Sequence, residues 1–203
     1  MSKPRDSASF EVERFIADCR AALTETSPPS AIHLLVARAV SDRAPLVRAL
    51  GEPTRGEVHT LHRSDDLTIL NVIWAPRMIL LPHDHQMWAA VGVYTGREDN
   101  IFWQRIADDP AGRIEATGAK ALGDGDAVPL ERDVIHSVAN PIPRLTGALH
   151  VYGGDFFGTE RSEWDPETLL ERPYDVERNM RLFEEANAFQ TGPPESRTTR
   201  PPS

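Results

Sequence analysis

Between residues 55 and 157, short apolar runs recur, and glycine, aspartate and proline separate them. Leu67 to Trp74 is one such run, and Trp88 to Tyr94 is another, which ends at the turn-forming pair Thr95–Gly96. Runs this short, bounded by turn residues, are typical of the strands of an all-β barrel. The sequence therefore predicts a β-barrel over residues 55–157.

Apolar residues at helical spacing lie on both sides of this barrel segment. Before it, two apolar stripes predict helices, and a third short helix is expected over residues 45–50; the stripes are Val12, Phe15, Ile16, Cys19 and Leu23, then Ile32, Leu35, Val36, Ala39 and Val40. After it, a helix is predicted over residues 175–188. We therefore divide the chain into a helical N-terminal extension (1–54), the barrel (55–157), a C-terminal segment whose helix packs on the barrel (158–190) and a flexible, proline-rich tail (191–203).

Composition excludes several classes of protein. A length of 203 residues suits one domain with elaborations. The net charge is −9 and Lys and Arg do not cluster, which argues against nucleic acid and anionic membranes as partners. No apolar run reaches membrane-spanning length, and we expect no signal peptide. The single cysteine, Cys19, rules out an internal disulfide. We expect a cytoplasmic protein, monomeric or homodimeric.

Three histidines form the most informative candidate site. His83 and His85 are two residues apart, so on a strand both side chains point to the same face. His136 lies in another predicted strand and can complete a set of three imidazoles. Single histidines in strands are usually structural, but a set of three favours a divalent transition metal with open coordination positions. His150 and Tyr152 share one strand face, and they would lie near that metal if this face is the barrel interior.

Two motifs carry a family resemblance. Pro82-His83-Asp84-His85 is followed by a glycine eleven residues after His85, and Gly123-Asp124 is followed by His136 and, four residues later, Asn140. Together they resemble the two motifs of the cupin superfamily, over roughly residues 55–157. The resemblance implies a mainly β fold, the cupin double-stranded β-helix barrel, here with N-terminal helices and a C-terminal helix.

Within the cupins, the chain resembles the thiol dioxygenases, the family of cysteine dioxygenase and 3-mercaptopropionate dioxygenase. Ala89 and Ala90 stand where many metal-binding cupins carry a glutamate ligand, and His150-Val151-Tyr152 matches a family segment near the end of the barrel. The resemblance implies one Fe(II) per chain, or another divalent metal, bound by the three histidines. It implies the oxidation of a small thiol by O2 to a sulfinic acid.

The resemblance also assigns roles to three side chains. Tyr152, oriented by His150, would hydrogen-bond to oxygen or substrate. Arg161, nine residues after Tyr152, matches the mercaptopropionate type and would pair with a substrate carboxylate. The competing interpretation makes Arg161 an exposed charge beside Glu160 and Glu163.

One departure from the family pattern keeps other functions open. Ala148 replaces the serine of the family's Ser-His-Tyr relay, and Thr146, on the same strand face, is a partial substitute. The alternatives are another metal-dependent cupin enzyme, either a C–C-cleaving dioxygenase of an enolate or an isomerase, and a metal-binding cupin without turnover.

Overall fold

The computed structural model describes residues 9–191, so nearly all of the predicted tail lies outside the described residues. The helices are α1 (Val12–Ala22), α2 (Pro28–Val40), α3 (Arg43–Leu50) and α4 (Val176–Thr191). The strands are β1 (Glu57–Arg63), β2 (Thr68–Trp74), β3 (Ile79–Asp84), β4 (Ala89–Thr95), β5 (Arg97–Arg105), β6 (Ile114–Gly123), β7 (Ala127–Leu130), β8 (Ile135–Ala139), β9 (Thr146–Tyr152), β10 (Ser162–Trp164) and β11 (Glu171–Pro173).

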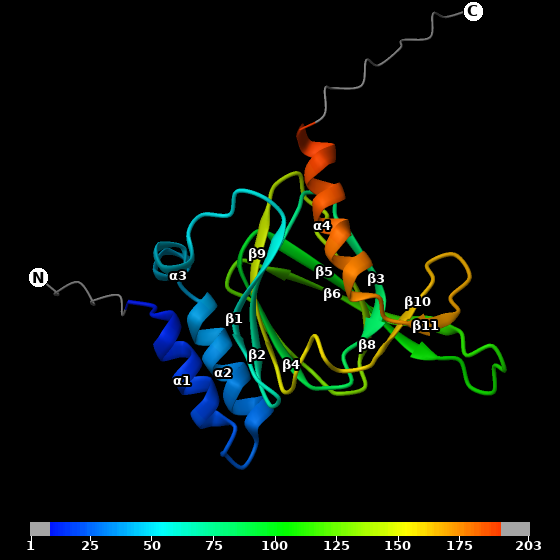
Figure 1. The fold of residues 1–203 in the computed structure, drawn as a ribbon, viewed down its shortest axis with the longest axis horizontal. Coiled ribbons are helices and arrows are strands. Elements are labelled where there is room, and N and C mark those ends of the chain that lie inside the picture. Colours follow the sequence, from blue (N-terminus) through cyan, green and yellow to red (C-terminus); the bar gives the residue numbers. More distant parts are fainter. Residues whose placement is uncertain (1–8, 192–203) are drawn as a thin grey trace, which may run out of the picture.

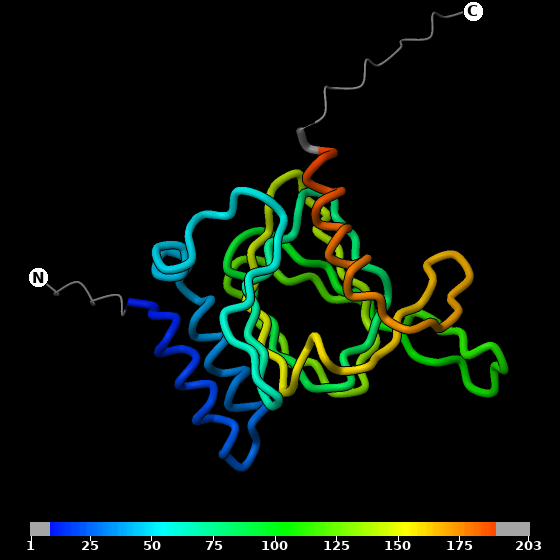
Figure 2. Tube along the Cα trace, in the orientation of Figure 1, coloured from blue at the N-terminus to red at the C-terminus, as the bar shows by residue number. Residues whose placement is uncertain are grey.

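The strands form two antiparallel sheets that enclose a common core. One sheet has the order β1-β2-β9-β4-β7, and the other has the order β11-β10-β3-β8-β5-β6. The chain passes repeatedly from one sheet to the other, which gives the barrel seen in Figures 1 and 2. The core draws side chains from both sheets, among them Leu70, Val91, Leu122 and Val138. The predicted mainly β barrel with N-terminal helices and a C-terminal helix is confirmed; the boundaries of the four predicted segments stay a prediction.

A helical layer covers the outer face of the first sheet. Strands β2, β4 and β9 are buried along their whole length, because their outward side chains meet α1 and α2. Gly92 on β4 permits this close approach: a Cβ there would lie 2.6 Å from Cγ1 of Val36 on α2. The strands that face the barrel interior are therefore supported from behind.

Helix α4 closes one end of the barrel (Figure 1). Its Phe183 ring stacks on Trp74 with the ring centroids 5.4 Å apart. About one turn further along the helix, Asn187 donates to the carbonyl of Gly56 at 2.8 Å and accepts from its N–H at 2.7 Å. The helix is thus fixed at two points over the barrel interior.

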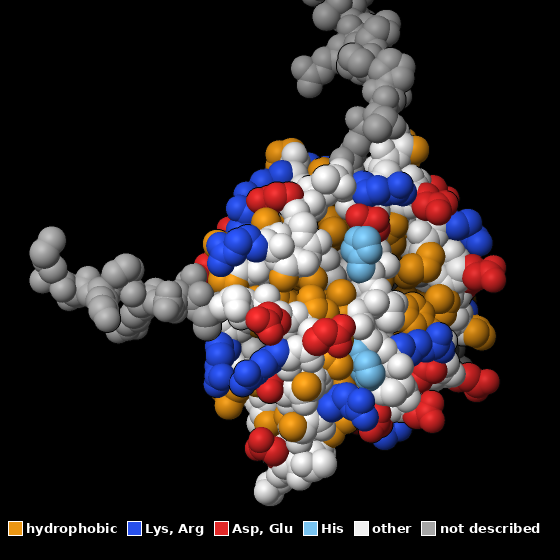
Figure 3. All heavy atoms as spheres, turned by 60° about the vertical axis from the view of Figure 1, so that its left-hand side comes forward, with side chains coloured by type: hydrophobic (Ala, Val, Ile, Leu, Met, Phe, Trp, Pro, Cys, Tyr) orange, Lys and Arg blue, Asp and Glu red, His pale blue; other side chains and the backbone are white. Residues whose placement is uncertain are grey.

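Within residues 9–191, no helix combines the length and apolar character needed to cross a membrane. On the face drawn in Figure 3, acidic and basic side chains are interspersed over the helical layer and the barrel edge.

Candidate metal centre

Strand pairing brings the three histidines together. In the register of β3 and β8, His83 lies directly opposite His136. Between this pair and the next matched pair, β3 contains one residue more than β8, which is a β-bulge. Pro82 occupies the bulge, where its lack of an N–H costs no ladder hydrogen bond. His85 follows the last residue of β3 rather than lying within the strand as predicted.

The three imidazoles converge through their Nε2 atoms. Nε2 of His85 lies 3.2 Å from Nε2 of His83 and 3.2 Å from Nε2 of His136. All three side chains are buried. Nitrogens about 2.1 Å from a shared ion would be separated by roughly 3.0–3.4 Å, depending on the angle between them. The spacing therefore fits a shared divalent metal ion.

Hydrogen bonds at the far side of two rings fix which nitrogen faces inward. Nδ1 of His83 donates to the carbonyl of Leu81 at 2.9 Å, and Nδ1 of His136 lies 2.7 Å from Oδ1 of Asn100. With hydrogen on Nδ1, each Nε2 presents a lone pair. Lone pairs that point at one another repel unless a cation lies between them. This arrangement of Nε2 atoms therefore suits a metal ion.

Burial keeps these histidines in the neutral form that metals bind. Desolvation lowers the pKa of His83 to about 4, although the bond to Leu81 opposes this. Desolvation, followed by the charges of neighbouring histidines, lowers the pKa of His85 and of His136 well below the ordinary value. At neutral pH all three are ligands without net charge.

His150 and Tyr152 lie beside this cluster. Nδ1 of His150 is 3.0 Å from the hydroxyl of Tyr152, and the Tyr152 ring meets the His85 ring edge-on with the centroids 5.1 Å apart. Burial raises the pKa of Tyr152, so its hydroxyl stays protonated and can donate. Their shared strand face is therefore the barrel interior.

A small, mostly apolar cavity adjoins the histidines. Its volume is about 30 Å³, room for about two water molecules. One polar residue that lines it, Asn179 on α4, was not among the candidates predicted from the sequence. Nδ2 of Asn179 donates to Glu163 at 3.0 Å and to the Asp175 carbonyl at 2.9 Å, whereas Oδ1 is buried and lacks a hydrogen-bond partner among residues 9–191. The other lining residues include Val58, Leu70, Val72, Trp74, Leu80, Val138, Phe156, Tyr174, Met180 and Phe183.

Arg161 is buried, contrary to the interpretation that made it a surface charge; only 7% of it is exposed. Its guanidinium carbon lies 4.2 Å from the ring centre of Phe156 and 4.1 Å from that of Tyr174. Nη1 donates to the carbonyls of Phe156 and Thr159, and Nε and Nη2 have no partner within the described part of the chain. Both rings line the cavity, but Arg161 itself does not. It borders the candidate site from behind these rings.

Glu98 on β5 is the second residue that the sequence did not indicate. It is fully buried, and its Oε2 accepts from Trp74 Nε1 at 2.8 Å and lies 3.5 Å from Nε2 of His150. Thr146, the predicted substitute for the family serine, binds the backbone N–H and carbonyl of Arg97 at 2.9 and 3.0 Å. Its hydroxyl is therefore engaged elsewhere, and the side chain that faces Nε2 of His150 is Glu98.

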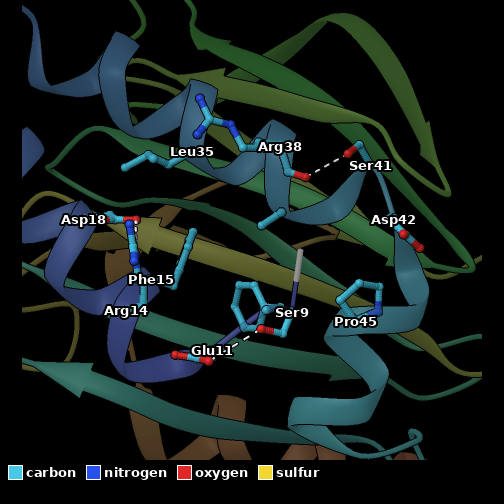
Figure 4. A pocket seen from close by; sticks show the side chains of 12 residues that line it. Ser9, Glu11, Arg14, Phe15, Asp18, Leu35, Arg38, Ser41, Asp42 and Pro45 are labelled. Atoms are coloured by element: carbon cyan, nitrogen blue, oxygen red, sulfur yellow. Dashed lines mark hydrogen bonds and ion pairs between the residues drawn. The ribbon is translucent and has the colours of Figure 1, made fainter. Parts of the chain in front are cut away.

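A larger hollow lies among α1, α2 and α3, on the outer side of the first sheet (Figure 4). No histidine or cysteine lines it, and two of its charged residues, Arg14 and Asp18, pair with each other at 3.8 Å. We therefore place the chemistry at the histidine cluster.

Fold and site together define a β-barrel with three histidines that could hold a divalent metal. No family model matches the chain. A cupin-family protein of Methanocaldococcus jannaschii with a double-stranded β-helix fold is 10% identical, with a TM-score of 0.43 over 52% of this chain and 86% of that one. A variant of Bacillus subtilis oxalate decarboxylase is 17% identical, with a TM-score of 0.39 over 51% of this chain and 27% of that one. Another structure of that enzyme, described for its Mn(II) centres, is 18% identical, with a TM-score of 0.38 over 51% and 27%. The chain thus matches about a quarter of the length of the oxalate decarboxylases.

Proposed function

We propose that this protein is a non-haem Fe(II) dioxygenase that oxidises a small carboxylated thiol to its sulfinic acid. The observation that carries the proposal is the ligand set: three neutral imidazoles meet at Nε2, with no carboxylate in the cluster. An Fe(II) ion held by them keeps its full double charge. Such an ion favours an anionic ligand, and a thiolate is a small anion with affinity for iron. The reaction adds both atoms of O2 to sulfur, so that R–SH becomes R–SO2H.

Iron would supply the redox chemistry, and the protein would supply position and environment. His83, His85 and His136 would hold the ion at the cavity wall. Tyr152 would donate its hydroxyl hydrogen toward the reacting oxygen or sulfur, and His150 would hold that hydroxyl in place at 3.0 Å. The mostly apolar lining lowers the local polarity, which strengthens each of these polar contacts.

The unpaired Nε and Nη2 atoms of Arg161 support the proposal that the substrate carries a carboxylate. Nε and Nη2 form the planar fork that matches two carboxylate oxygens. Arg63, at the surface, uses the same two nitrogens to bind Asp155 at 2.7 and 2.8 Å. In Arg161 this fork is buried and has no partner among residues 9–191, and an unpaired buried donor is costly. We propose that the substrate carboxylate fills it, reaching past the rings of Phe156 and Tyr174.

A second candidate is a dioxygenase that cleaves a C–C bond in an enolate. The same ligand set favours any small anion, and Glu98 rather than a serine contacts His150, which departs from the thiol dioxygenase pattern. We also propose a cytoplasmic setting, since the one cysteine, Cys19, is a buried free thiol.

The test begins with metal analysis of the purified protein, followed by anaerobic loading with Fe(II). Oxygen uptake is then measured with 3-mercaptopropionate, cysteine and 2-mercaptoethanol, and with an enolate panel that includes acetylacetone. We expect uptake with a carboxylated thiol, with one O2 consumed per sulfinate detected by mass spectrometry. Uptake with enolates alone would establish the second candidate. Iron binding without uptake on either panel would indicate a binding protein without turnover.

A further inference from the structure

Glu98 is a buried carboxylate that the proposed reaction does not use. Oε1 accepts from Nδ2 of Asn100 at 3.1 Å, and Oε2 faces Trp74 and His150. Burial opposes the charge on Glu98, but the contacts with His150, Asn100 and Trp74 outweigh it and hold its pKa below the ordinary value. Because Asn100 Nδ2 and Trp74 Nε1 both donate to it, Glu98 acts as an acceptor of hydrogen bonds.

One chain of hydrogen bonds runs from Glu98 to the candidate metal ligand His136. An asparagine side chain offers donors on its nitrogen and an acceptor on its oxygen. Because the Asn100 NH2 group faces Glu98, its Oδ1 must face Nδ1 of His136, 2.7 Å away. Nδ1 of His136 then carries the hydrogen, and Nε2 keeps its lone pair toward His85. The charge on Glu98 thus determines which tautomer His136 adopts.

A second set of contacts runs from Glu98 to Tyr152. Nε2 of His150 is buried without a hydrogen-bond partner among residues 9–191 and lies 3.5 Å from Oε2 of Glu98, so the nearby carboxylate favours a hydrogen on that nitrogen. Nδ1 of the same ring, 3.0 Å from the Tyr152 hydroxyl, is then the acceptor. Both sets of contacts begin at one carboxylate and end in the same cavity.

We propose that Glu98 is a positioning residue that fixes which atoms donate and which accept in both sets of contacts. It thereby presents Nε2 of His136 to the metal and orders the hydroxyl of Tyr152. The inference rests on the metal centre of the proposed function, and it is independent of the thiol substrate.

The test is Glu98→Gln, which keeps the shape but replaces one acceptor by a donor. The amide oxygen is expected to face Trp74 and His150, which are two donors, so its NH2 group faces Asn100. Two NH2 groups cannot pair, so Asn100 must turn and present its NH2 group to His136. His136 would then carry its hydrogen on Nε2, where the metal should bind. We expect Fe(II) affinity to fall about ten- to a hundredfold, as outer-shell substitutions at metal sites do.

A compensating substitution distinguishes an effect on the direction of the hydrogen bonds from an effect on side-chain packing. In Glu98→Gln/Asn100→Asp the carboxylate moves one position along the chain of hydrogen bonds. It can accept both from the new amide and from Nδ1 of His136, while the total charge is unchanged. We expect this double variant to regain most of the lost affinity. Asn100→Asp alone places two carboxylates side by side and should bind Fe(II) more weakly than the wild type.

Two measurements decide the outcome. Competition with a chromophoric chelator under anaerobic conditions gives the Fe(II) affinity. Long-range proton–nitrogen NMR of the metal-free protein gives the tautomer of His136, and thermal unfolding reports whether each variant is folded. Wild-type affinity and an Nδ1 hydrogen in Glu98→Gln would overturn the inference, as would a double variant no better than Glu98→Gln. If Glu98→Gln does not fold, the affinity and tautomer of the double variant decide. If the wild type binds no metal, the proposed function fails, and the tautomer in the metal-free protein still tests the inference.

Discussion

Arg161→Ala tests whether the buried guanidinium recognises a substrate carboxylate. The open Nε and Nη2 fork can make two charge-assisted hydrogen bonds, and each bond to a charged group contributes about 1.5–3 kcal/mol. Not all of this is lost, because a carboxylate left without arginine can draw in water. We therefore expect Arg161→Ala to lose about 1.5–3 kcal/mol of transition-state stabilisation in total, which corresponds to a decrease of about ten- to a hundredfold in kcat/KM. Arg161→Lys keeps the charge without the fork and should fall between alanine and the wild type.

The assay compares 3-mercaptopropionate with 2-mercaptoethanol, which is neutral and of similar length. The loss should fall on the carboxylated thiol and largely spare the neutral one. Arg63→Ala is the matched control, because its fork binds Asp155 at the surface and its side chain is 48% exposed. That variant should leave both activities within about twofold of the wild type, since surface ion pairs contribute little. Equal losses on both thiols in Arg161→Ala would refute the reasoning and make the stacked arginine structural, and no loss on either would remove Arg161 from the site.

Three further predictions concern the metal and its ligands. Alanine at His83, His85 or His136 should abolish stoichiometric iron binding, measured by metal analysis with His59→Ala as the half-exposed control; a variant that keeps full occupancy identifies a histidine that is not a ligand. The metal-free protein should lose stability as pH falls from about 6.5 to about 4, because His83 binds a proton in the unfolded chain but stays neutral when it is buried in the folded protein. Each such histidine should lower the free energy of unfolding by about 1.4 kcal/mol per pH unit over this range. Denaturant unfolding at several pH values measures this change, and a free energy of unfolding that does not vary with pH would contradict the neutral cluster. Nitric oxide added to the Fe(II) protein should give an electron paramagnetic resonance signal that changes when the substrate is added, and the absence of change with every thiol and enolate would count against direct binding to iron.

The barrel and the three histidines could be predicted because their signals are local. Strands show as short apolar runs between turn residues, and the two-residue spacing of His83 and His85 is visible in the sequence itself. Strands β2, β4 and β9 are buried along their whole length because helices cover their outer faces, which is a tertiary effect that the sequence of one strand does not show.

Glu98 and Asn179 could not be predicted because long-range packing gives them their environments. Glu98 stands between Arg97 and Asp99, which pair with each other at 2.7 Å near the surface, so the local sequence reads as a solvated charged run. Only the packing of one sheet against the other brings Trp74 on β2 and His150 on β9 to its carboxylate on β5. Asn179 lies on a helix that reaches the cavity from more than forty residues beyond the last histidine ligand.

That late position of α4 has a consequence for how the protein is made. During synthesis the strands that carry His83, His85 and His136 leave the ribosome before α4 does, and chains generally begin to fold as they emerge. The barrel can then assemble while its open end still faces the solvent, and the docking of Phe183 and Asn187 closes it afterwards. A metal ion captured in that interval needs no path through the finished wall. Iron supplied during synthesis should therefore be incorporated faster than iron added to the completed protein.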